Sequence, residues 1–224
     1  MTAAAERAAP RVALVAGAVG RFGEALLNRV LGSGDYRMVV ALAQAPMALG
    51  VRGLALAALH ELPPLDDVFV ALSAHHEGEG RSFHGRDAPF VQVGAGQLLA
   101  VARAACDAGA SRLVLIAPTS VWQQMGGMHA GLSGETELAL AGLPLASLTV
   151  LRPVVAQASR ARGIVERVAA IYTSLQMLAM PRSMDILPSE KLALCALLAM
   201  HQAVDGVRIL GADKLPGLLA RAPQ

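Results

Sequence analysis

The sequence has few aromatic residues, two cysteines and no long run of one charge. Aromatic side chains make up 3% of the 224 residues while apolar residues reach 54%, so the core must be aliphatic. Cys106 and Cys195 lie far apart in helix-like patterns, which excludes the disulfide framework of small secreted domains. The 19 basic and 17 acidic residues are scattered, so no basic patch predicts nucleic-acid binding.

Long hydrophobic runs are absent as well. The longest uncharged stretches, 38–51 and 138–151, are about 14 residues each and contain a proline, whereas a membrane-spanning helix needs about 20 residues. Residues 1–10 include Glu6 and Arg7 and no apolar segment, so we expect no signal peptide. Together these features predict a cytoplasmic protein that does not bind membranes and keeps both thiols reduced.

A glycine-rich stretch with the pattern of a phosphate-binding turn follows the first apolar run. Residues 12–16 are apolar without polar alternation, as in a strand buried on both faces of a parallel sheet. Gly17, Gly20 and Gly23 come next, and apolar positions over 25–31 recur at helical spacing. In such a unit the glycines permit a tight turn, close approach of a pyrophosphate and helix–strand packing. The spacing is GxxGxxG rather than GxGxxG, so the prediction of a bound dinucleotide depends on the strand and helix around it.

Strands and helices alternate along the rest of the chain. The patterns predict further strands at 38–44, 51–59, 68–73, 112–118, 147–155 and 207–210, and helices at 90–108, 134–143, 164–178 and 189–202. This order predicts an α/β fold: a doubly wound, Rossmann-like parallel sheet between two layers of helices, which makes three layers in all. We expect one domain over 1–224. Within it, 10–155 form the nucleotide-binding core and 156–224 form a small α-rich extension on the substrate side that ends in a tail.

Ligands of such sheets bind at the carboxyl ends of the strands, beside the first strand. The loops 74–89 and 123–133 follow two of these ends and contain glycine, so we expect them to form walls of the pocket. The residues expected at the cofactor are Gly17, Ala18, Val19, Gly20, Arg21, Phe22, Gly23, Gln44, Ser73, Ala74 and Ala117.

The order of these motifs resembles the atypical short-chain dehydrogenase/reductase superfamily, and more closely its Tat-interacting oxidoreductase-like branch. VALVAGAVGRFGEALLNRVL is similar to the nucleotide-binding opening of that family, and DDVFVALS is similar to its fourth strand. VGAGQLLAVARAACDAGASRLVLIAP resembles its long helix and fifth strand, and Arg152 and Pro153 match an Arg-Pro pair after the sixth strand. The resemblance implies a dinucleotide cofactor, NADP or NAD, without distinguishing the two.

The catalytic positions of that superfamily are altered in this chain. The family's serine, tyrosine and lysine fall on Pro118, His129 and Ser133. The second strand ends in ALAQAP, with neither an acidic residue for a ribose 2′-hydroxyl nor an arginine for a 2′-phosphate. The family's aspartate after the third strand is also missing, since only His60 and Glu61 stand there. Acid–base groups contribute about 10²- to 10⁴-fold, so their loss predicts inefficient carbonyl reduction.

These observations favour an NAD(P)-binding protein with a degenerate Ser-Tyr-Lys site that binds or senses its cofactor. The alternative is an active oxidoreductase that uses His129 as its acid–base group, with Thr119 and Ser120 as hydrogen-bond donors to a carbonyl. The intact glycines argue against a purely structural subunit. The histidines and carboxylates within 75–87 match no zinc-binding spacing, so no metal is predicted. The small-molecule ligand is not identified by the sequence, and a homodimer is left open.

Overall fold

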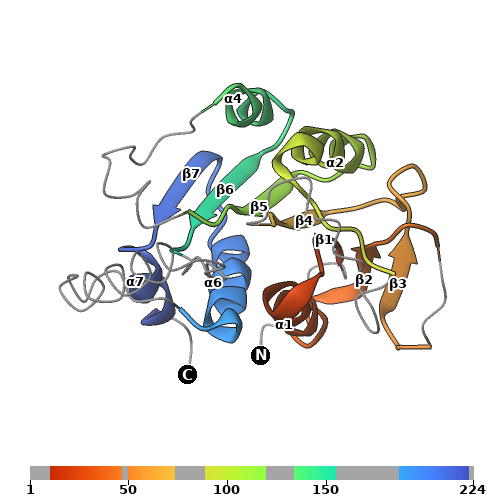
Figure 1. Ribbon diagram of the computed structural model, residues 1–224, viewed down its shortest axis with the longest axis horizontal. Coiled ribbons are helices and arrows are strands. Elements are labelled where there is room, and N and C mark those ends of the chain that lie inside the picture. Colours follow the sequence, from red (N-terminus) through yellow and green to blue (C-terminus); the bar gives the residue numbers. More distant parts are fainter. Residues whose placement is uncertain (1–10, 47–49, 74–88, 120–133, 155–186, 222–224) are drawn as a thin grey trace, which may run out of the picture.

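The computed structural model describes residues 11–46, 50–73, 89–119, 134–154 and 187–221 (Figure 1). They form a seven-stranded sheet in the order β3-β2-β1-β4-β5-β6-β7, and every adjacent pair is parallel. The strands are β1 (Arg11–Ala16), β2 (Tyr36–Leu42), β3 (Leu54–Ala57), β4 (Asp67–Ala71), β5 (Arg112–Ile116), β6 (Ser147–Arg152) and β7 (Gly206–Gly211). The helices are α1 (Gly20–Leu31), α2 (Ala95–Asp107), α4 (Glu135–Ala141), α6 (Ser189–His201) and α7 (Leu215–Leu219). The predicted doubly wound fold is confirmed, with its switch point between β1 and β4.

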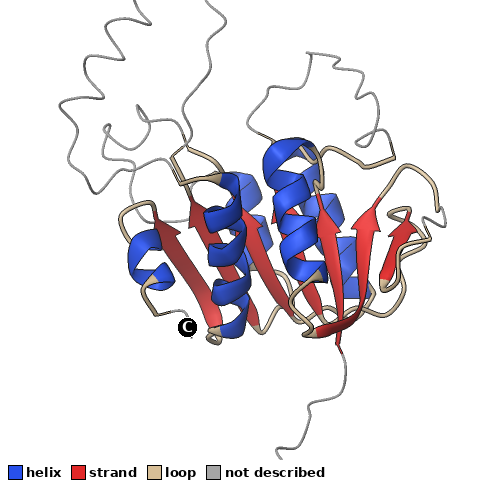
Figure 2. Ribbon diagram, turned by 90° about the horizontal axis from the view of Figure 1, so that it is seen from below, coloured by secondary structure: helices blue, strands red, loops and turns tan. Residues whose placement is uncertain are grey.

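Two aliphatic cores cover the two faces of the sheet, which gives the three predicted layers (Figure 2). The helices α1, α6 and α7 pack on one face, and α2 and α4 pack on the other. Along β1, Ala13 and Val15 face the first core, whereas Val12 and Leu14 face the second. Because both faces are covered, the strands carry continuous apolar runs instead of a polar alternation.

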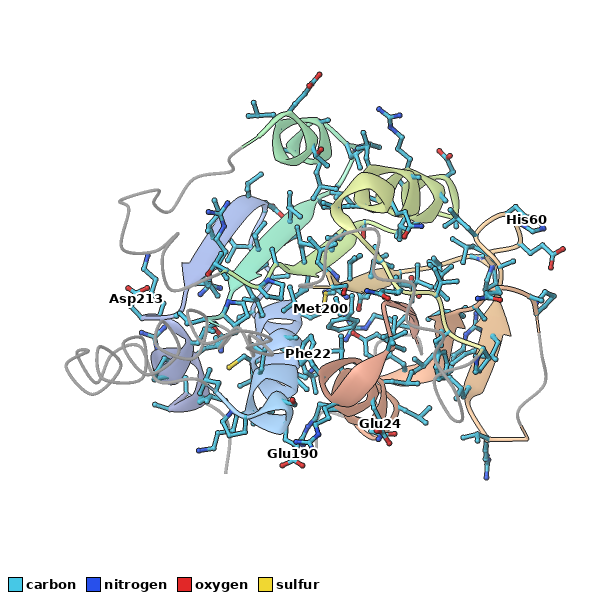
Figure 3. The ribbon with its side chains drawn as sticks, viewed as in Figure 1. Phe22, Glu24, His60, Glu190, Met200 and Asp213 are labelled. Atoms are coloured by element: carbon cyan, nitrogen blue, oxygen red, sulfur yellow. The ribbon has the colours of Figure 1, made fainter. Side chains whose placement is uncertain are left out.

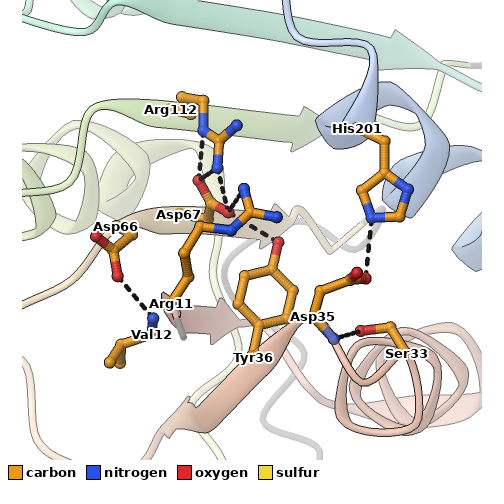
Figure 4. Close-up of polar contacts among 9 residues, drawn as sticks. All are labelled: Arg11, Val12, Ser33, Asp35, Tyr36, Asp66, Asp67, Arg112 and His201. Atoms are coloured by element: carbon orange, nitrogen blue, oxygen red, sulfur yellow. Dashed lines mark hydrogen bonds and ion pairs between the residues drawn. The ribbon is translucent and has the colours of Figure 1, made fainter. Parts of the chain in front are cut away.

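A buried ion cluster joins four strands at the amino edge of the sheet (Figure 4). The Asp67 carboxylate, at the start of β4, accepts hydrogen bonds from the Arg112 guanidinium of β5 at 2.6 and 2.7 Å. Arg11 of β1 lies 3.1 Å from the same carboxylate, and the Tyr36 hydroxyl of β2 donates to it at 2.9 Å. Burial and the Asp67 charge raise the pKa of Tyr36, so its hydroxyl stays protonated and remains a donor.

The helix predicted at 90–108 begins only at Ala95, which corrects the sequence prediction. Gly94 has an extended backbone, and its N–H donates to Gln97 Oε1 at 3.3 Å, which fixes the start of α2. Residues 89–93 pair instead with the ends of two strands. Helical periodicity in the sequence did not reveal this, because the partners of 89–93 lie far away along the chain.

The remaining differences concern ends of elements and the last helix. The tail predicted after the seventh strand contains α7, whose Pro216 lies in the first turn, where a missing N–H is tolerated. The strands predicted at 38–44, 51–59 and 147–155 end at Leu42, Ala57 and Arg152, because the residues that follow leave the regular ladder. The helix predicted at 164–178, the loop 123–133 and all but Pro89 of the loop 74–89 lie outside the described residues.

Two further features concern the cysteines and the described helices. Both cysteines are free thiols, with Cys195 buried in α6 and Cys106 half-buried in α2. Within the described parts of the chain, no helix combines the length and apolar character needed to cross a membrane.

Candidate functional site

The three glycines after β1 have three different surroundings. Gly17 has a φ of +83°, and a Cβ there would overlap the Ala71 carbonyl oxygen at the end of β4. A Cβ on Gly23 would overlap the Gly17 carbonyl oxygen and lie 2.6 Å from the Ala18 carbonyl carbon. Gly20 has a φ of +70°, yet a Cβ there would meet nothing within 4 Å. Gly17 and Gly23 therefore allow close packing of strand and helix, and Gly20 leaves an opening at the start of α1.

This opening has the features of a diphosphate cradle. It lies at the N-terminus of a twelve-residue helix, where backbone N–H groups and the helix dipole favour an anion. Val19 precedes the helix with an extended backbone and provides no side-chain cap, and the first turn carries no acidic residue. The side chain of Ala18 is buried in the core beneath α1 and that of Phe22 packs against the same core, so these residues offer a ligand their backbone rather than their side chains.

The carboxyl ends of β2, β4 and β5 bring further predicted residues to the same edge of the sheet. Gln44 is exposed after β2, and its backbone N–H donates to the Pro89 carbonyl at 3.1 Å. Ser73 is half-buried after β4, and its hydroxyl accepts a hydrogen bond from the Gln92 side-chain amide. Ala117 is half-buried after β5. Ala74 lies outside the described residues.

The end of β2 is here named the ribose corner, because a dinucleotide's ribose lies at this place in such folds. It carries no charge in the described residues. Gln44 is followed by Ala45 and Pro46, so the residues at this strand end provide no carboxylate and no cation. Glu61, after β3, is exposed and lies 3.4 Å from His60. The cradle therefore fits a diphosphate, whereas the corner lacks the acidic anchor that usually binds a ribose 2′-hydroxyl.

One of the three candidate catalytic residues is described, and its hydroxyl proton is already engaged. The Thr119 hydroxyl donates to the Pro153 carbonyl at 3.3 Å, and the Thr119 backbone N–H donates to the same oxygen at 2.9 Å. Pro118 lies half-buried at the end of β5 and has no side-chain donor. Ser120 and His129 lie outside the described residues, as does Ser133, so their roles remain predictions.

Arg21 lies on a different surface from the rest of the predicted cofactor site. It is exposed and lines a groove of about 1160 Å³ that runs between α1 and α6. Glu24 of α1 and Glu190 of α6 line the same groove, and Figure 3 shows both side chains on the lower side of these helices. None of the three glycines lines this groove. Its mixed charges match no single ligand, and we treat the glycine turn, not the groove, as the candidate site.

Sequence reasoning missed Gln92 and the segment around it. Residues 89–93 lie beside Gln44 and Ser73, so they belong to the same edge as the glycine turn. The alternation in Val91-Gln92-Val93, followed by Gly94, is the local signal that could have indicated a short extended segment here.

No protein-family model matches the chain, and no curated protein matches it. Among solved structures, the Bordetella bronchiseptica enzyme WbmG in complex with NAD is similar, with a TM-score of 0.51 and 16% identity over 96% of this chain and 79% of that one. A short chain dehydrogenase family protein from Francisella tularensis has a TM-score of 0.51 and 11% identity over 95% and 100% of the two chains. Likenesses at such low identity carry information on the fold and not on the reaction. The chain therefore has the doubly wound, Rossmann-like α/β fold that these two proteins share.

Proposed function

We propose that this protein is a short-chain dehydrogenase/reductase-like protein that binds NAD(H) or NADP(H) at the glycine turn and has a degenerate catalytic site. The single observation that carries the proposal is the contrast between two packed glycines and one open glycine at the start of α1. Gly17 and Gly23 have no room for a side chain, whereas Gly20 has room that nothing in the described chain fills. Open space alone does not mark a site, since Gly34 has it too; Gly20 differs because its opening lies at the N-terminus of α1, just past the end of β1.

The fold neighbours support the choice of ligand. WbmG was solved with NAD, and this chain is similar to it over 96% of its residues. In this chain, backbone N–H groups at the start of α1 would hold the diphosphate, and Gln44 would face the adenosine ribose with a neutral amide. When bound, the nicotinamide ring supplies hydride chemistry. The Tat-interacting oxidoreductase-like branch remains part of this proposal.

We infer a binding or sensing role because the carbonyl-side groups are missing. A developing alkoxide needs a proton or strong hydrogen bonds. Pro118 cannot donate one, and the Thr119 hydroxyl already donates to Pro153. Histidine is the side chain that most often transfers protons at neutral pH, so His129 is the candidate acid–base group. An active oxidoreductase based on His129 is therefore the alternative that an activity assay has to test.

The test is a titration of NADH and NADPH against the purified protein by calorimetry. Gly20→Val introduces a branched side chain into the opening and is expected to abolish binding. Gly34→Val is the matched control, because Gly34 also has a positive φ, +77°, and open space around its Cβ but lies in the turn before β2, at the amino edge. No binding of either cofactor at millimolar concentration would contradict the proposal, as would equal loss of binding in the two variants.

A further inference from the structure

The segment 89–93 is here named the crossing segment. It lies between the ends of β2 and β4, in the position that β1 would occupy if it continued past Gly17. On the β2 side, the Gln44 N–H donates to the Pro89 carbonyl at 3.1 Å, and the Val91 N–H donates to the Leu42 carbonyl at 3.0 Å. Ala43 and Phe90 form an antiparallel bridge between these two bonds. The crossing segment thus continues the sheet beside β2, past the end of β1.

The crossing segment is also bound on the β4 side. The Ser73 N–H donates to the Val93 carbonyl at 2.9 Å, Val93 forms a parallel bridge with Leu72, and the Gln92 amide donates to the Ser73 hydroxyl. The Val93 side chain is fully buried, and Phe90 packs against the core beneath α1. Backbone partners on both sides and burial hold the segment in place.

This position coincides with the place where a doubly wound sheet binds its ligand. The crevice lies outside the carboxyl ends at the switch point, here between β1 and β4, and the adenosine ribose lies near the end of β2. The crossing segment spans from Leu42 and Gln44 to Ser73 and so lies past the end of β1, between two of the strand ends that border this crevice.

We propose that the crossing segment competes with the adenosine half of the dinucleotide, so that binding requires its release from β2. The inference rests on the proposed function, since it concerns the same site. The apparent affinity of a ligand falls in proportion to the fraction of protein in the competent state. A closed crossing segment therefore weakens dinucleotide binding without any change in the glycine cradle, and loosening it strengthens binding.

The test removes one bond of the crossing segment and measures the dissociation constant of NADH. Val91→Pro deletes the N–H that donates to Leu42, and Val91→Thr keeps that N–H with a side chain of similar shape. One hydrogen bond corresponds to about a fivefold change in an equilibrium constant, so Val91→Pro should bind NADH about fivefold more tightly than the wild type. Val91→Thr should bind like the wild type.

A second variant and a second measurement keep the test decisive if Val91→Pro fails to fold. Phe90→Ala removes packing without touching the backbone and should also tighten NADH binding. Hydrogen exchange of the wild-type Val91 and Gln44 amides should speed up when NADH binds, because release from β2 removes their carbonyl partners, Leu42 and Pro89. Unchanged or weaker NADH binding in the loosened variants, or slower exchange with NADH, would overturn the inference while leaving the proposed function intact. Absence of NADH binding in the wild type and both variants would overturn the two together.

Discussion

At the scale of residues, glycine is required in the glycine turn for two different reasons, close packing and a left-handed backbone. Gly17 and Gly23 are fixed by backbone atoms that a Cβ would overlap, whereas Gly20 is fixed by its left-handed φ of +70° alone. Backbone cannot move aside as a flexible side chain can, so the first two positions tolerate no other residue. Gly20 tolerates a side chain sterically, but that side chain would stand where a ligand would bind.

The glycines therefore predict unequal losses of stability. Gly23→Ala should lower the free energy of unfolding by about 3 kcal/mol, because its Cβ would lie 2.6 Å from the Ala18 carbonyl carbon and the packing cannot relax. Gly20→Ala should cost about 1 kcal/mol, the strain of a left-handed alanine. Urea unfolding of both variants measures the difference. Equal losses would contradict the packing that we describe.

A second residue-scale prediction concerns the ion cluster at the amino edge. Arg112→Met leaves the buried Asp67 carboxylate without its two-bond partner and should cost about 3 kcal/mol at pH 8. Burial already raises the pKa of Asp67 to about 6 in the wild type, and loss of the Arg112 charge should raise it further in the variant. Both proteins therefore lose stability as pH rises through this range, and the variant should lose more. The deficit relative to wild type should therefore shrink from pH 8 to pH 5.

Urea unfolding at both pH values measures this deficit. Arg103→Met, the same substitution at an exposed position of α2, is the control and should change stability by less than about 0.5 kcal/mol. A deficit for Arg112→Met that stays constant with pH would show that Asp67 does not titrate as argued.

At the scale of elements, α6 is the most deeply buried helix of the described fold. Eight of its thirteen residues are buried, and it packs against both α1 and the sheet. Cys195 lies on this helix with no exposed surface, and burial raises its pKa to about 11. Cys106, on α2, is half-buried, and burial raises its pKa as well.

The alkylation rates of the two thiols therefore report on how readily α2 and α6 expose their buried residues. At pH 7.5 iodoacetamide should modify Cys106 at least about tenfold faster than Cys195, because a buried thiol reacts only when its helix leaves the core. Mass spectrometry of peptides from timed reactions measures the two rates, and Cys106→Ser isolates the slower one. Equal rates in the folded protein would mean that α6 leaves the sheet as easily as α2 exposes its thiol.

At the scale of the whole molecule, the parallel sheet gathers the candidate site at one edge and the ion cluster at the other. The carboxyl edge carries the glycine turn, the crossing segment and the end of β5, and the amino edge carries Asp67 and its partners. The ion cluster is thereby separated in space from the candidate site. Substitutions at the amino edge should change the free energy of unfolding with little effect on cofactor affinity.

The whole molecule also carries the prediction about catalysis. The wild type should not reduce aldehydes, ketones or quinones efficiently even with NADPH bound, because Pro118 and Ser133 supply neither the donor nor the cation of the family's site. A triple variant, Pro118→Ser, His129→Tyr and Ser133→Lys, should gain cofactor-dependent turnover in a spectrophotometric assay. If the wild type is active and His129→Ala lowers kcat by about a hundredfold, His129 is catalytic and the binding role is wrong.

The sequence by itself determined the order of the seven strands, the three-layer fold and the position of the glycine turn. These features depend on local patterns: apolar runs over 12–16 and 113–116 for buried strands, and helical spacing after Gly23. The positions of glycines carry information of their own, because glycine permits backbone conformations that few other residues adopt.

Only the tertiary structure decided which distant segments of the chain pair with the ends of the strands. Residues 90–93 of the crossing segment were predicted as helix because their pairing partners, Leu42 and Ser73, are about 50 and 20 residues away along the chain, beyond the reach of local periodicity. For the same reason the sequence did not reveal the Asp67 cluster, whose members come from four strands. Hydrogen bonds between distant segments depend on where the fold brings them, and propensity does not encode that placement.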